Sequence, residues 1–341
     1  MQAIGVGLIG YGLGGRAFHA PFIQVTPGMT LRAIVSRDAA KVHADLPDTP
    51  VVADVEALLA QTGIDLVVVS SPDALHAGHA IAALQAGKHV VIDKPFATSL
   101  ADARRIAAAS RASDRLVVAF QNRRWDADFL TLRRLIASER LGDIVELESR
   151  FDRWRPHPAP TWKEARDGGS WIDLGPHLVD QAMVLFGRPQ AITADLATFR
   201  DGAEAPDYFH AVLHYPRCRA VLHSSKLTAA NRLRFAVHGT RGSWIKHGID
   251  PQEAATVAGL TPGDDQWGFD PDAGLLTEGD GDQTVSPIPN ERGDYRLLWL
   301  ALAAAIRGEG PNPVPASEAI RVMEVLEAGL RSAAERRTIE L

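Results

Sequence analysis

Asp173 and His177 could together move a proton, because a carboxylate and an imidazole stand four residues apart. The glycines before them, Pro176 and the apolar run after them predict the start of a helix. Residues at this spacing share one face of a helix, so the carboxylate can orient the imidazole and favour its protonated form. The pair suits proton transfer near neutral pH. The alternative is a surface ion pair at a helix start, which is the commoner meaning of an isolated D-x-x-x-H.

A glycine-rich turn near the N-terminus predicts a nucleotide site. An apolar run, Ala3–Ile9, is followed by Gly10-Tyr11-Gly12-Leu13-Gly14-Gly15, a G-x-G-x-x-G, and then by a helical pattern over Arg16–Val25. In a strand–turn–helix unit, the glycines let the backbone approach a pyrophosphate, whose charge meets the helix N-terminus. The alternative is a glycine-rich turn that serves packing only.

The residues after the second expected strand bear on the choice of cofactor. NAD-binding turns usually carry an acid about 20 residues beyond the glycines, where it binds the ribose 2′-hydroxyl. Here that place falls on Ser36, followed by Arg37 and Asp38. A hydroxyl and a guanidinium would hold a 2′-phosphate by charge-assisted hydrogen bonds, which favours NADP over NAD. Alternatively, Ser36 or Asp38 caps the helix that starts at Ala39, and Asp38 could also reach the ribose.

Further polar residues follow the ends of later expected strands. Ser71 follows the strand over residues 64–69, Lys94 the strand over 89–92, and Asn122 the strand over 116–120. Ligands of parallel sheets lie beyond the carboxyl ends of the strands. Asn122 is therefore expected to meet the nicotinamide ribose or carboxamide. Lys94 could equally be a solvated turn lysine, and Arg124 a solvated charge at a helix start.

The hydrophobic pattern predicts two domains of different architecture. Strands and helices alternate over residues 1–122, which predicts a doubly wound parallel sheet. From Ile144 the period shifts towards two, which predicts an open, mainly antiparallel sheet with helices on one face, within residues 123–341. The glycines, prolines and aspartates of residues 250–290 predict a long irregular loop. An uncovered sheet face favours a homodimer.

Composition excludes several classes of protein and site. Acidic residues outnumber basic ones, 42 to 36, so there is no electrostatic case for binding nucleic acid. The single cysteine, Cys218, excludes an intrachain disulfide and a cysteine-cluster metal site, and no carboxylate–histidine spacing predicts another metal site. No apolar run predicts a signal peptide or membrane helix, and the expected location is cytoplasmic.

Taken together and in this order, these motifs resemble the Gfo/Idh/MocA oxidoreductase family over essentially the whole chain. They are the glycine turn, Ser71–Pro72, Asp93–Pro95 and the stretch from Gly169 to His177. The family usually has glutamate at the place of Asp93. The resemblance implies a Rossmann domain followed by an open-faced α/β domain that carries substrate and dimer contacts.

Four longer stretches are similar to the branch of this family that contains NADP-dependent scyllo-inositol dehydrogenases. They are YGLGGRAFHAP from Tyr11, QNRRWDADFLTL from Gln121, FDRWRP from Phe151 and VHGTRGSWIKHGIDPQE from Val237. In that branch the position of Arg37 is likewise basic. The resemblance implies Lys94, Asp173 and His177 as the catalytic group, with Trp162 near the cofactor.

The expected reaction is hydride transfer between NADP, or alternatively NAD, and a secondary alcohol of a cyclic polyol or sugar. The expected cofactor-binding residues are Gly10, Tyr11, Gly12, Leu13, Gly14, Gly15, Ser36, Arg37, Ser71, Pro72, His76, Asp93, Lys94, Asn122 and Trp162. The expected substrate contacts are Arg123, Trp125, Arg153, Arg155, His157 and Tyr295. Alternatives are an NADP-binding regulatory protein without turnover, a reductase of another carbonyl or imine, and a structural or partner-binding protein. The expected assembly is a homodimer or homotetramer, without nucleic-acid or membrane partners.

Overall fold

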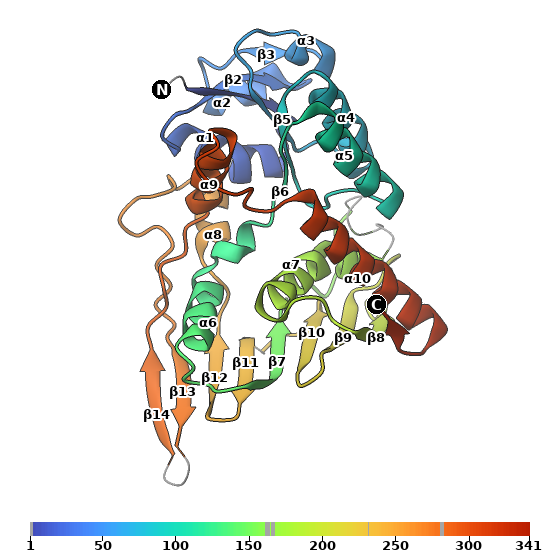
Figure 1. The fold of residues 1–341 in the computed structure, drawn as a ribbon, viewed down its shortest axis with the longest axis vertical. Coiled ribbons are helices and arrows are strands. Elements are labelled where there is room, and N and C mark those ends of the chain that lie inside the picture. The colour runs from blue at the N-terminus through green and yellow to red at the C-terminus, as the bar shows by residue number, and fades with distance from the viewer. Residues whose placement is uncertain (1–2, 161–163, 165–167, 231, 280–282) are drawn as a thin grey trace. The chain divides into compact units, whose positions relative to one another are not determined.

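The chain forms two compact units, each built from separate segments. The computed structural model describes residues 3–160, 164, 168–230, 232–279 and 283–341 (Figure 1). Unit 1 comprises Met1–Trp125, Gln252–Trp267 and Asp294–Ile320; unit 2 comprises Asp126–Pro251, Gly268–Gly293 and Arg321–Leu341. The sequence predicts two consecutive domains, over residues 1–122 and 123–341. In the structure, two later segments, Gln252–Trp267 and Asp294–Ile320, belong to the first unit instead.

Unit 1 contains a six-stranded parallel sheet, as predicted. Its strands are β1 (Ile4–Ile9), β2 (Met29–Val35), β3 (Val51–Val52), β4 (Leu66–Val69), β5 (His89–Ile92) and β6 (Val117–Ala119). Their spatial order is β3-β2-β1-β4-β5-β6, and each neighbouring pair is parallel. The order reverses between β1 and β4, which is where a doubly wound sheet binds its ligand. Every residue of β1 and β4 is buried, as expected for strands covered on both faces.

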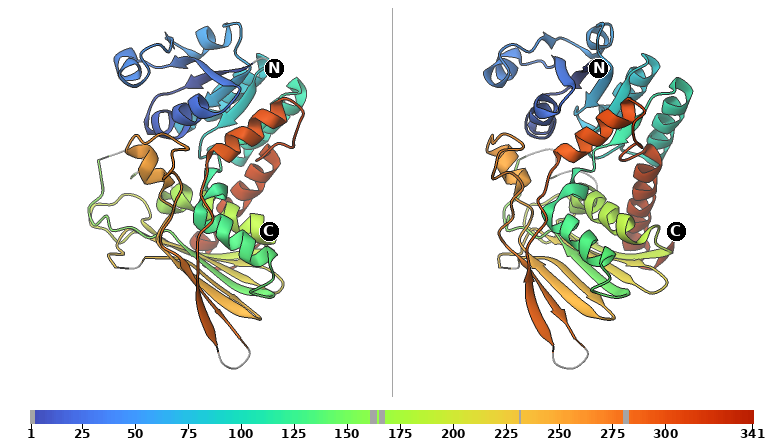
Figure 2. Two further views of the ribbon diagram at one scale, coloured as in Figure 1. Left: turned by 90° about the vertical axis from the view of Figure 1, so that its left-hand side faces the viewer. Right: turned by 60° about the vertical axis from the view of Figure 1, so that its left-hand side comes forward.

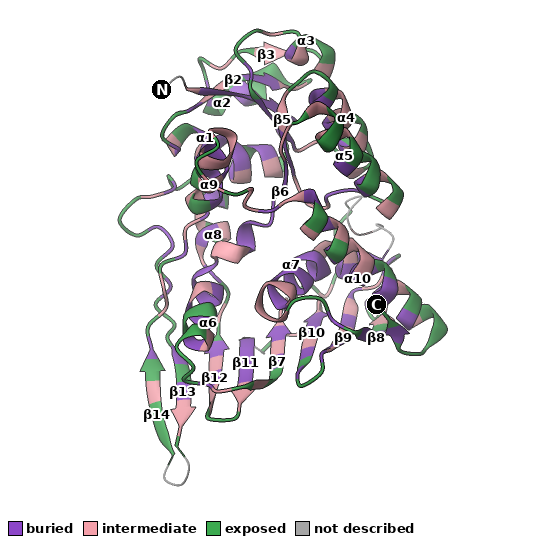
Figure 3. Cartoon of the chain, viewed as in Figure 1, coloured by how far each residue is buried: buried purple, intermediate pink, exposed green. Residues whose placement is uncertain are grey.

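Helices connect these strands and cover the sheet. They are the π-helix η1 (Gly14–His19), α1 (Ala20–Val25), α2 (Ala39–Asp45), α3 (Val55–Leu59), the 3-10 turn η2 (Asp73–Leu75), α4 (His76–Gln85), α5 (Leu100–Ser113) and the 3-10 turn η3 (Asn122–Trp125). The single helix predicted over Arg16–Val25 is therefore η1 continued by α1. The buried faces of α4 and α5 are visible in Figure 3.

Two late segments complete the core of unit 1. They contribute α8 (Gln252–Val257), α9 (Arg296–Ile306) and the first residues of α10 (Ala316–Glu335). Phe22 of α1 packs with its ring centroid 5.7 Å from that of Trp267 and 6.1 Å from that of Tyr295. These aromatic contacts bury surface that the N-terminal segment alone would expose to water.

Unit 2 contains a nine-stranded, mainly antiparallel sheet, also as predicted. Its strands are β7 (Ile144–Arg150), β8 (Ala191–Ala197), β9 (Tyr208–His214), β10 (Arg219–Ser225), β11 (Leu233–Gly239), β12 (Gly242–His247), β13 (Gly274–Glu278), β14 (Thr284–Ile288) and β15 (Ile339–Glu340). Their order is β14-β13-β12-β11-β7-β10-β9-β8-β15. Among the described pairs, β7 with β10 is the parallel one. The irregular loop predicted over residues 250–290 was wrong, because this stretch forms α8, β13 and β14, and the two strands pair with each other.

The described helices of unit 2 lie on one face of this sheet. They are α6 (Ala127–Ala137), α7 (Gly169–Phe186) and the later part of α10 (Figure 2). Phe129 of α6, Leu178 of α7 and Leu326 of α10 share one hydrophobic core with the inward side chains of the strands. No described helix of the chain is both long and apolar enough to cross a membrane.

Helix α7 starts earlier than the position of Pro176 suggested. The helix begins at Gly169, so Pro176 lies in its interior and not in its first turn. Proline lacks the N–H that would donate to the carbonyl of Ile172, which costs helix stability. The burial of Trp171 and Leu178 on either side of it offsets that cost.

A buried ion pair between α6 and the sheet gives a test of packing in unit 2. Arg234 donates to Asp128 (3.1 Å), Ser149 (2.8 Å) and Gln181 (2.7 Å), and both charged side chains are fully buried. Asp128→Ala leaves a buried guanidinium without its carboxylate, so we expect the free energy of unfolding to fall by about 3–5 kcal/mol in urea denaturation. The matched control is Glu139→Ala, which removes the exposed partner of Arg241 and should cost no more than about 1 kcal/mol. Equal losses would contradict this assignment.

Candidate active site

The predicted site residues divide between the two units. In unit 1, the carboxyl ends of β1, β4 and β5 lie side by side and carry Gly10, Ser71 and Lys94. Backbone hydrogen bonds continue the sheet register into these loops, from Ser70 N–H to Ile9 O (2.9 Å) and from Asp93 N–H to Val69 O (2.9 Å). The sheet therefore positions the glycine turn and the lysine turn beside each other. Unit 2 holds Asp173, His177, Arg153, Arg155 and His157.

The glycine turn is packed so closely that side chains would not fit at several positions. A Cβ on Gly10, whose φ is +98°, would lie 2.4 Å from the carbonyl oxygen of Ser70. A Cβ on Gly15 would lie 2.2 Å from the carbonyl oxygen of Gly10. Gly12, by contrast, faces open space, and Leu13 is exposed. Close packing on one side and an open backbone on the other fit the approach of a pyrophosphate.

The carboxylate of Asp93 lies beneath this turn. A Cβ on Gly14 would come within 2.4 Å of its Oδ2. Ser70 Oγ donates to Oδ2 (2.9 Å), the Lys94 N–H donates to Oδ1 (2.7 Å), and Nε2 of the fully buried His19 lies 3.2 Å from Oδ2. Burial alone would raise the pKa of Asp93, but His19, the Lys94 N–H and Ser70 together hold it well below its usual range. Asp93 therefore remains ionised and supports the turn from below.

His76 lies between the two neighbouring loops and is buried. Its Nδ1 is 2.7 Å from the carbonyl oxygen of Pro95, and its Nε2 is 2.8 Å from the carbonyl oxygen of Ser71. Both ring nitrogens are thus engaged with the backbone. His76 links the loop that carries Ser71 to the loop that carries Lys94.

The loop after β2 carries the cap of the next helix. Asp38 caps α2 by accepting from the Lys41 N–H (2.9 Å), and the hydroxyl of Ser36 donates to the Asp38 carbonyl (3.2 Å). The prediction that Asp38 caps this helix is confirmed. Arg37 is exposed, and within the described chain no hydrogen bond or ion pair engages its guanidinium.

Tyr11 is anchored by a charged pair on the adjoining helices. Its hydroxyl donates to Asp45 (3.1 Å), and the same carboxylate accepts from Arg16 (2.8 Å). Burial, followed by the charge of Asp45, raises the pKa of Tyr11 to about 12. The phenol is therefore neutral at physiological pH and acts as a hydrogen-bond donor that fixes the start of the glycine turn.

Residues 122–125 form η3 and lie against α8. Asn122 and Arg123 are buried, and Arg123 forms an ion pair with Glu253. Gln252 donates to the carbonyl oxygen of Trp125 (3.1 Å) and accepts from the backbone N–H of Tyr295 (2.8 Å). Tyr295, predicted as a substrate contact, is fully buried in the core of unit 1.

Three of these supporting residues were missed in the sequence. His19 looked like part of a helical pattern, and Gln252 and Glu253 fell within a segment predicted to be a loop. The signal that could have found them is that all three lie within YGLGGRAFHAP and VHGTRGSWIKHGIDPQE, two of the stretches that carry the family resemblance. Burial of a histidine or glutamine among aromatic residues cannot be read from such short motifs without the fold.

In unit 2, Asp173 and His177 lie one turn apart within α7, as their spacing predicted. His177 is buried and Asp173 is half-buried. The next turn carries Asp180 and Gln181, also buried. A buried histidine one helical turn from a carboxylate is better suited to controlled proton transfer than a solvated surface pair. Trp162, predicted near the cofactor, lies outside the described residues.

The predicted substrate residues of unit 2 follow strand β7. The Arg153 N–H donates to the Ser225 carbonyl (2.9 Å) and the Arg155 N–H to the Lys226 carbonyl (2.8 Å), which ties this segment to the end of β10. The Arg153 guanidinium lies 5.0 Å from the ring centroid of Phe151. Arg155 and His157 are exposed, so their side chains are accessible to a solute.

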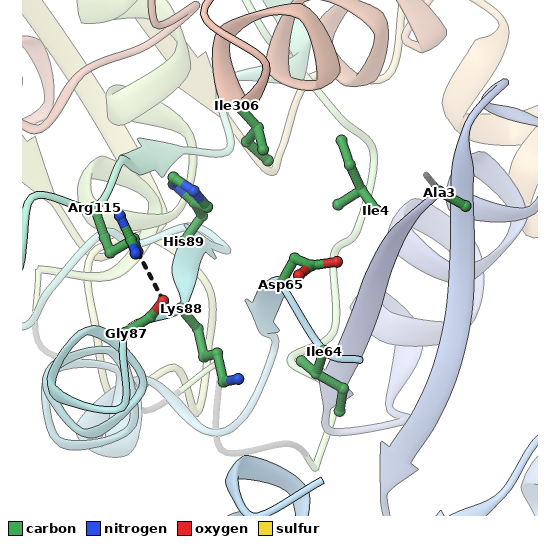
Figure 4. A pocket seen from close by; sticks show the side chains of 9 residues that line it. All are labelled: Ala3, Ile4, Ile64, Asp65, Gly87, Lys88, His89, Arg115 and Ile306. Atoms are coloured by element: carbon green, nitrogen blue, oxygen red, sulfur yellow. Dashed lines mark hydrogen bonds between the residues drawn. The ribbon is translucent and has the colours of Figure 1, made fainter. Parts of the chain in front are cut away.

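A pocket of about 370 Å³ lies at the amino ends of strands of the unit 1 sheet, whereas the glycine turn lies at their carboxyl ends (Figure 4). Asp65, which precedes β4, and His89, which begins β5, contribute to its wall together with Arg115. None of the predicted site residues lines it. Ligands of parallel sheets bind beyond the carboxyl ends of the strands and not at their amino ends, so this pocket is not the candidate active site.

Comparison with known proteins agrees with the two-unit architecture. The model of the NAD-binding Rossmann fold of the Gfo/Idh/MocA oxidoreductase family matches residues 4–120, and that of its C-terminal alpha/beta domain matches residues 133–341. The uncharacterized oxidoreductase YdgJ of Escherichia coli is 47% identical, covering 98% of both chains. The scyllo-inositol 2-dehydrogenase (NADP(+)) IolW of Bacillus subtilis is 38% identical, covering 100% of this chain and 97% of its own. The solved structure of the Yersinia pestis protein YPO2259 has a TM-score of 0.97 at 46% identity, covering 100% of this chain and 97% of that one.

The packing of Gly15 gives a direct test of the glycine turn. Gly15→Ala forces a Cβ against the Gly10 carbonyl, so we expect at least a tenfold loss of NADP affinity and a fall of about 1–3 kcal/mol in the free energy of unfolding. Gly78→Ala is the matched control, because a Cβ on this helical glycine of α4 meets nothing within 4 Å. It should leave affinity unchanged and raise stability by up to about 1 kcal/mol. Calorimetric titration and thermal unfolding measure both, and unchanged NADP affinity in Gly15→Ala would reject the turn as the cofactor site.

Proposed function

Because the chain belongs to the Gfo/Idh/MocA oxidoreductase family and is an NAD(P)-dependent oxidoreductase, we propose that it oxidises a secondary alcohol of a cyclic polyol or sugar, and reduces the corresponding ketone, with NADP as the preferred cofactor. The observation that carries this proposal is the buried His177 one turn from Asp173 on α7, in a chain that also keeps Lys94 beyond β5. A general base, a carboxylate that can stabilise its protonated form and a cationic hydrogen-bond donor are groups that supply proton transfer and oxyanion stabilisation at an alcohol carbon.

In this mechanism each side chain has a separate role. His177 accepts the hydroxyl proton as the carbon is oxidised, and Asp173 stabilises the imidazolium that results. Lys94 supplies a cationic hydrogen-bond donor of the kind that stabilises the negative charge developing on an alcohol oxygen. The nicotinamide, when bound, supplies the hydride chemistry. In the reverse direction His177 returns the proton to the carbonyl oxygen.

The cofactor preference rests on the loop after β2. The Asp38 carboxylate, which would repel a 2′-phosphate, is engaged in capping α2. Arg37 is exposed and has no described partner, so its guanidinium is available to a 2′-phosphate without losing another interaction. NAD, which lacks the 2′-phosphate, would not use this contact of Arg37.

The substrate class rests on chemistry and on a relative. Arg153, Arg155 and His157 follow β7 in unit 2, and such donors suit a ligand with several hydroxyl groups. IolW, at 38% identity, is named a scyllo-inositol 2-dehydrogenase that uses NADP(+). A panel of inositol isomers and aldoses, assayed at the reduced-nicotinamide absorbance band, tests the proposal. NADP binding without turnover of any polyol would favour a sensor or a different carbonyl or imine substrate.

A second copy of the chain is the proposed macromolecular partner. Along β9, buried Phe209, Ala211 and Leu213 alternate with half-buried residues that point to the opposite face from the helices. A broad sheet face of this kind is usually covered by association. Sedimentation analysis of the purified protein would show a dimer or tetramer if this proposal is right.

Replacement of His177 tests the proton-transfer role. His177→Ala removes the base, so we expect kcat to fall by about 10²–10⁴-fold while the dissociation constant of NADPH changes little. Steady-state kinetics and fluorescence titration of the variant measure the two quantities. A kcat within a few-fold of wild type would exclude His177 as the base.

Replacement of Arg37 tests the phosphate assignment. Arg37→Ala should raise the KM for NADP by at least tenfold and leave that for NAD nearly unchanged, because one charge-assisted phosphate contact is lost. Arg32→Ala, which removes an exposed arginine from β2, is the control and should alter neither value. Equal losses for both cofactors in Arg37→Ala would contradict a role in binding the 2′-phosphate.

A further inference from the structure

The pocket of Figure 4 lies where four neighbouring strands of the unit 1 sheet begin. Ile4 begins β1, Asp65 precedes β4, His89 begins β5, and Arg115 lies shortly before β6. The pocket volume of about 370 Å³ is within the range of pockets that hold small organic molecules. No described residue of the candidate active site lines this pocket, so a ligand bound in it would occupy a separate site.

Lys88 supplies the pocket with a cation that the protein does not neutralise. The residue is half-buried, and among the described residues no hydrogen bond or ion pair engages its ammonium group. The one carboxylate of the wall belongs to Asp65, whose Oδ2 accepts from the Gly5 N–H (2.8 Å). A half-buried ammonium group without a carboxylate partner gains from an anionic ligand, because charge-assisted hydrogen bonds are stronger than neutral ones.

Arg115 adds a second cation, and the backbone holds it in place. Its Nε donates to the carbonyl oxygen of Gly87 (2.8 Å), drawn as a dashed line in Figure 4, and its Nη1 donates to the carbonyl oxygen of Asp114 (2.9 Å). Carbonyl oxygens orient the guanidinium without neutralising its charge. Within the described chain Nη2 has no hydrogen-bond partner and remains available to a ligand. A guanidinium that is already oriented loses less conformational entropy when it binds an anion.

His89 adds a neutral donor to the same wall. Its Nδ1 accepts from the Leu116 N–H (3.0 Å), so the proton of the neutral ring lies on Nε2. Burial first, and then the charge of Arg115, lower the pKa of His89, which keeps the ring neutral at physiological pH. The Nε2–H group has no partner among the described residues, so it can donate to a bound ligand.

Three isoleucines make another part of the wall apolar. Ile4 and Ile64 are buried, and Ile306, at the end of α9, is half-buried. From this combination we propose that the pocket binds a small organic anion, whose carboxylate or phosphate group is held by Lys88 and Arg115 and whose compact apolar body packs against the isoleucines.

The charges of the wall also limit the class of ligand. Lys88 and Arg115 are opposed by Asp65, so the balance of charge favours an anion. The Asp65 carboxylate would repel a second anionic group, which favours a ligand that carries one such group over a dicarboxylate.

Titration of the protein with butyrate and with propyl phosphate, at constant ionic strength and without cofactor or polyol, tests the site. Each probe joins one anionic group to a short apolar chain, and NMR of histidine-labelled protein follows the ring of His89. We expect at least one probe to shift the His89 signals saturably, with a Kd of about 10 mM or below. The relative affinities of the two probes distinguish a carboxylate ligand from a phosphate ligand.

Butyramide, the neutral counterpart of butyrate, is the control for charge and should bind at least about tenfold more weakly than the better of the two anions. Equal affinity for butyramide, or no saturable shift with either anion up to about 100 mM, would overturn the proposal. Neither result depends on whether the protein turns over a polyol, so the proposed oxidoreductase reaction is tested separately.

Substitution of Lys88 then locates the bound anion. Lys88→Ala breaks no contact among the described residues, and we expect it to weaken binding by at least about tenfold. Lys88→Arg keeps the charge and should bind within about threefold of wild type. The matched control is Lys41→Ala, which removes an exposed lysine from α2, after the carboxyl end of β2, and should leave the affinity unchanged. Unchanged affinity in Lys88→Ala, or equal weakening in Lys41→Ala, would reject this pocket as the binding site.

Discussion

The negative charge of Asp93, enclosed beneath a turn of glycines, is the constraint on which the rest of the cofactor unit depends. Ser70 after β4 and the Lys94 N–H after β5 both donate to its carboxylate. Gly14, in the turn after β1, lets the carboxylate come close because it has no side chain. Removing a carboxylate from water is costly unless donors surround it. Those donors, with His19, are drawn from the segments that must meet for the site to form. Electrostatics and backbone geometry therefore specify the same arrangement.

The two sheets were predictable because their patterns depend on local periodicity. Unbroken apolar runs such as Val67–Val69 indicate strands covered on both faces, and the alternation along β9 indicates a sheet with one covered face. The stretch from residue 250 to 290 was mispredicted for the opposite reason. Its glycines and prolines suggest a loop, whereas β13 is stabilised by pairing with β12 and β14, which local composition does not report.

The candidate site was only partly predictable. Motif spacing placed Asp173 and His177 one helical turn apart, and the structure has them within α7. The supporting residues were harder to predict, because a buried histidine such as His19 resembles any other residue of an amphipathic helix until its partners are known. Gln252 makes the same point: its amide bridges Trp125 and Tyr295, which are far apart in the sequence. Long-range polar contacts of this kind leave no periodic signal.

The discontinuous composition of unit 1 also determines the order in which the chain can mature on the ribosome. Trp267, Tyr295 and Trp299 pack on Phe22, His19 and Phe120, yet they are synthesised long after the six parallel strands. Until then the emerging nucleotide-binding half has exposed aromatic surface and lacks the α9 and α8 segments that complete it. The unit thus becomes a finished domain only when nearly the entire polypeptide is available. A truncation after residue 125 would leave an incomplete core rather than a minimal cofactor-binding module.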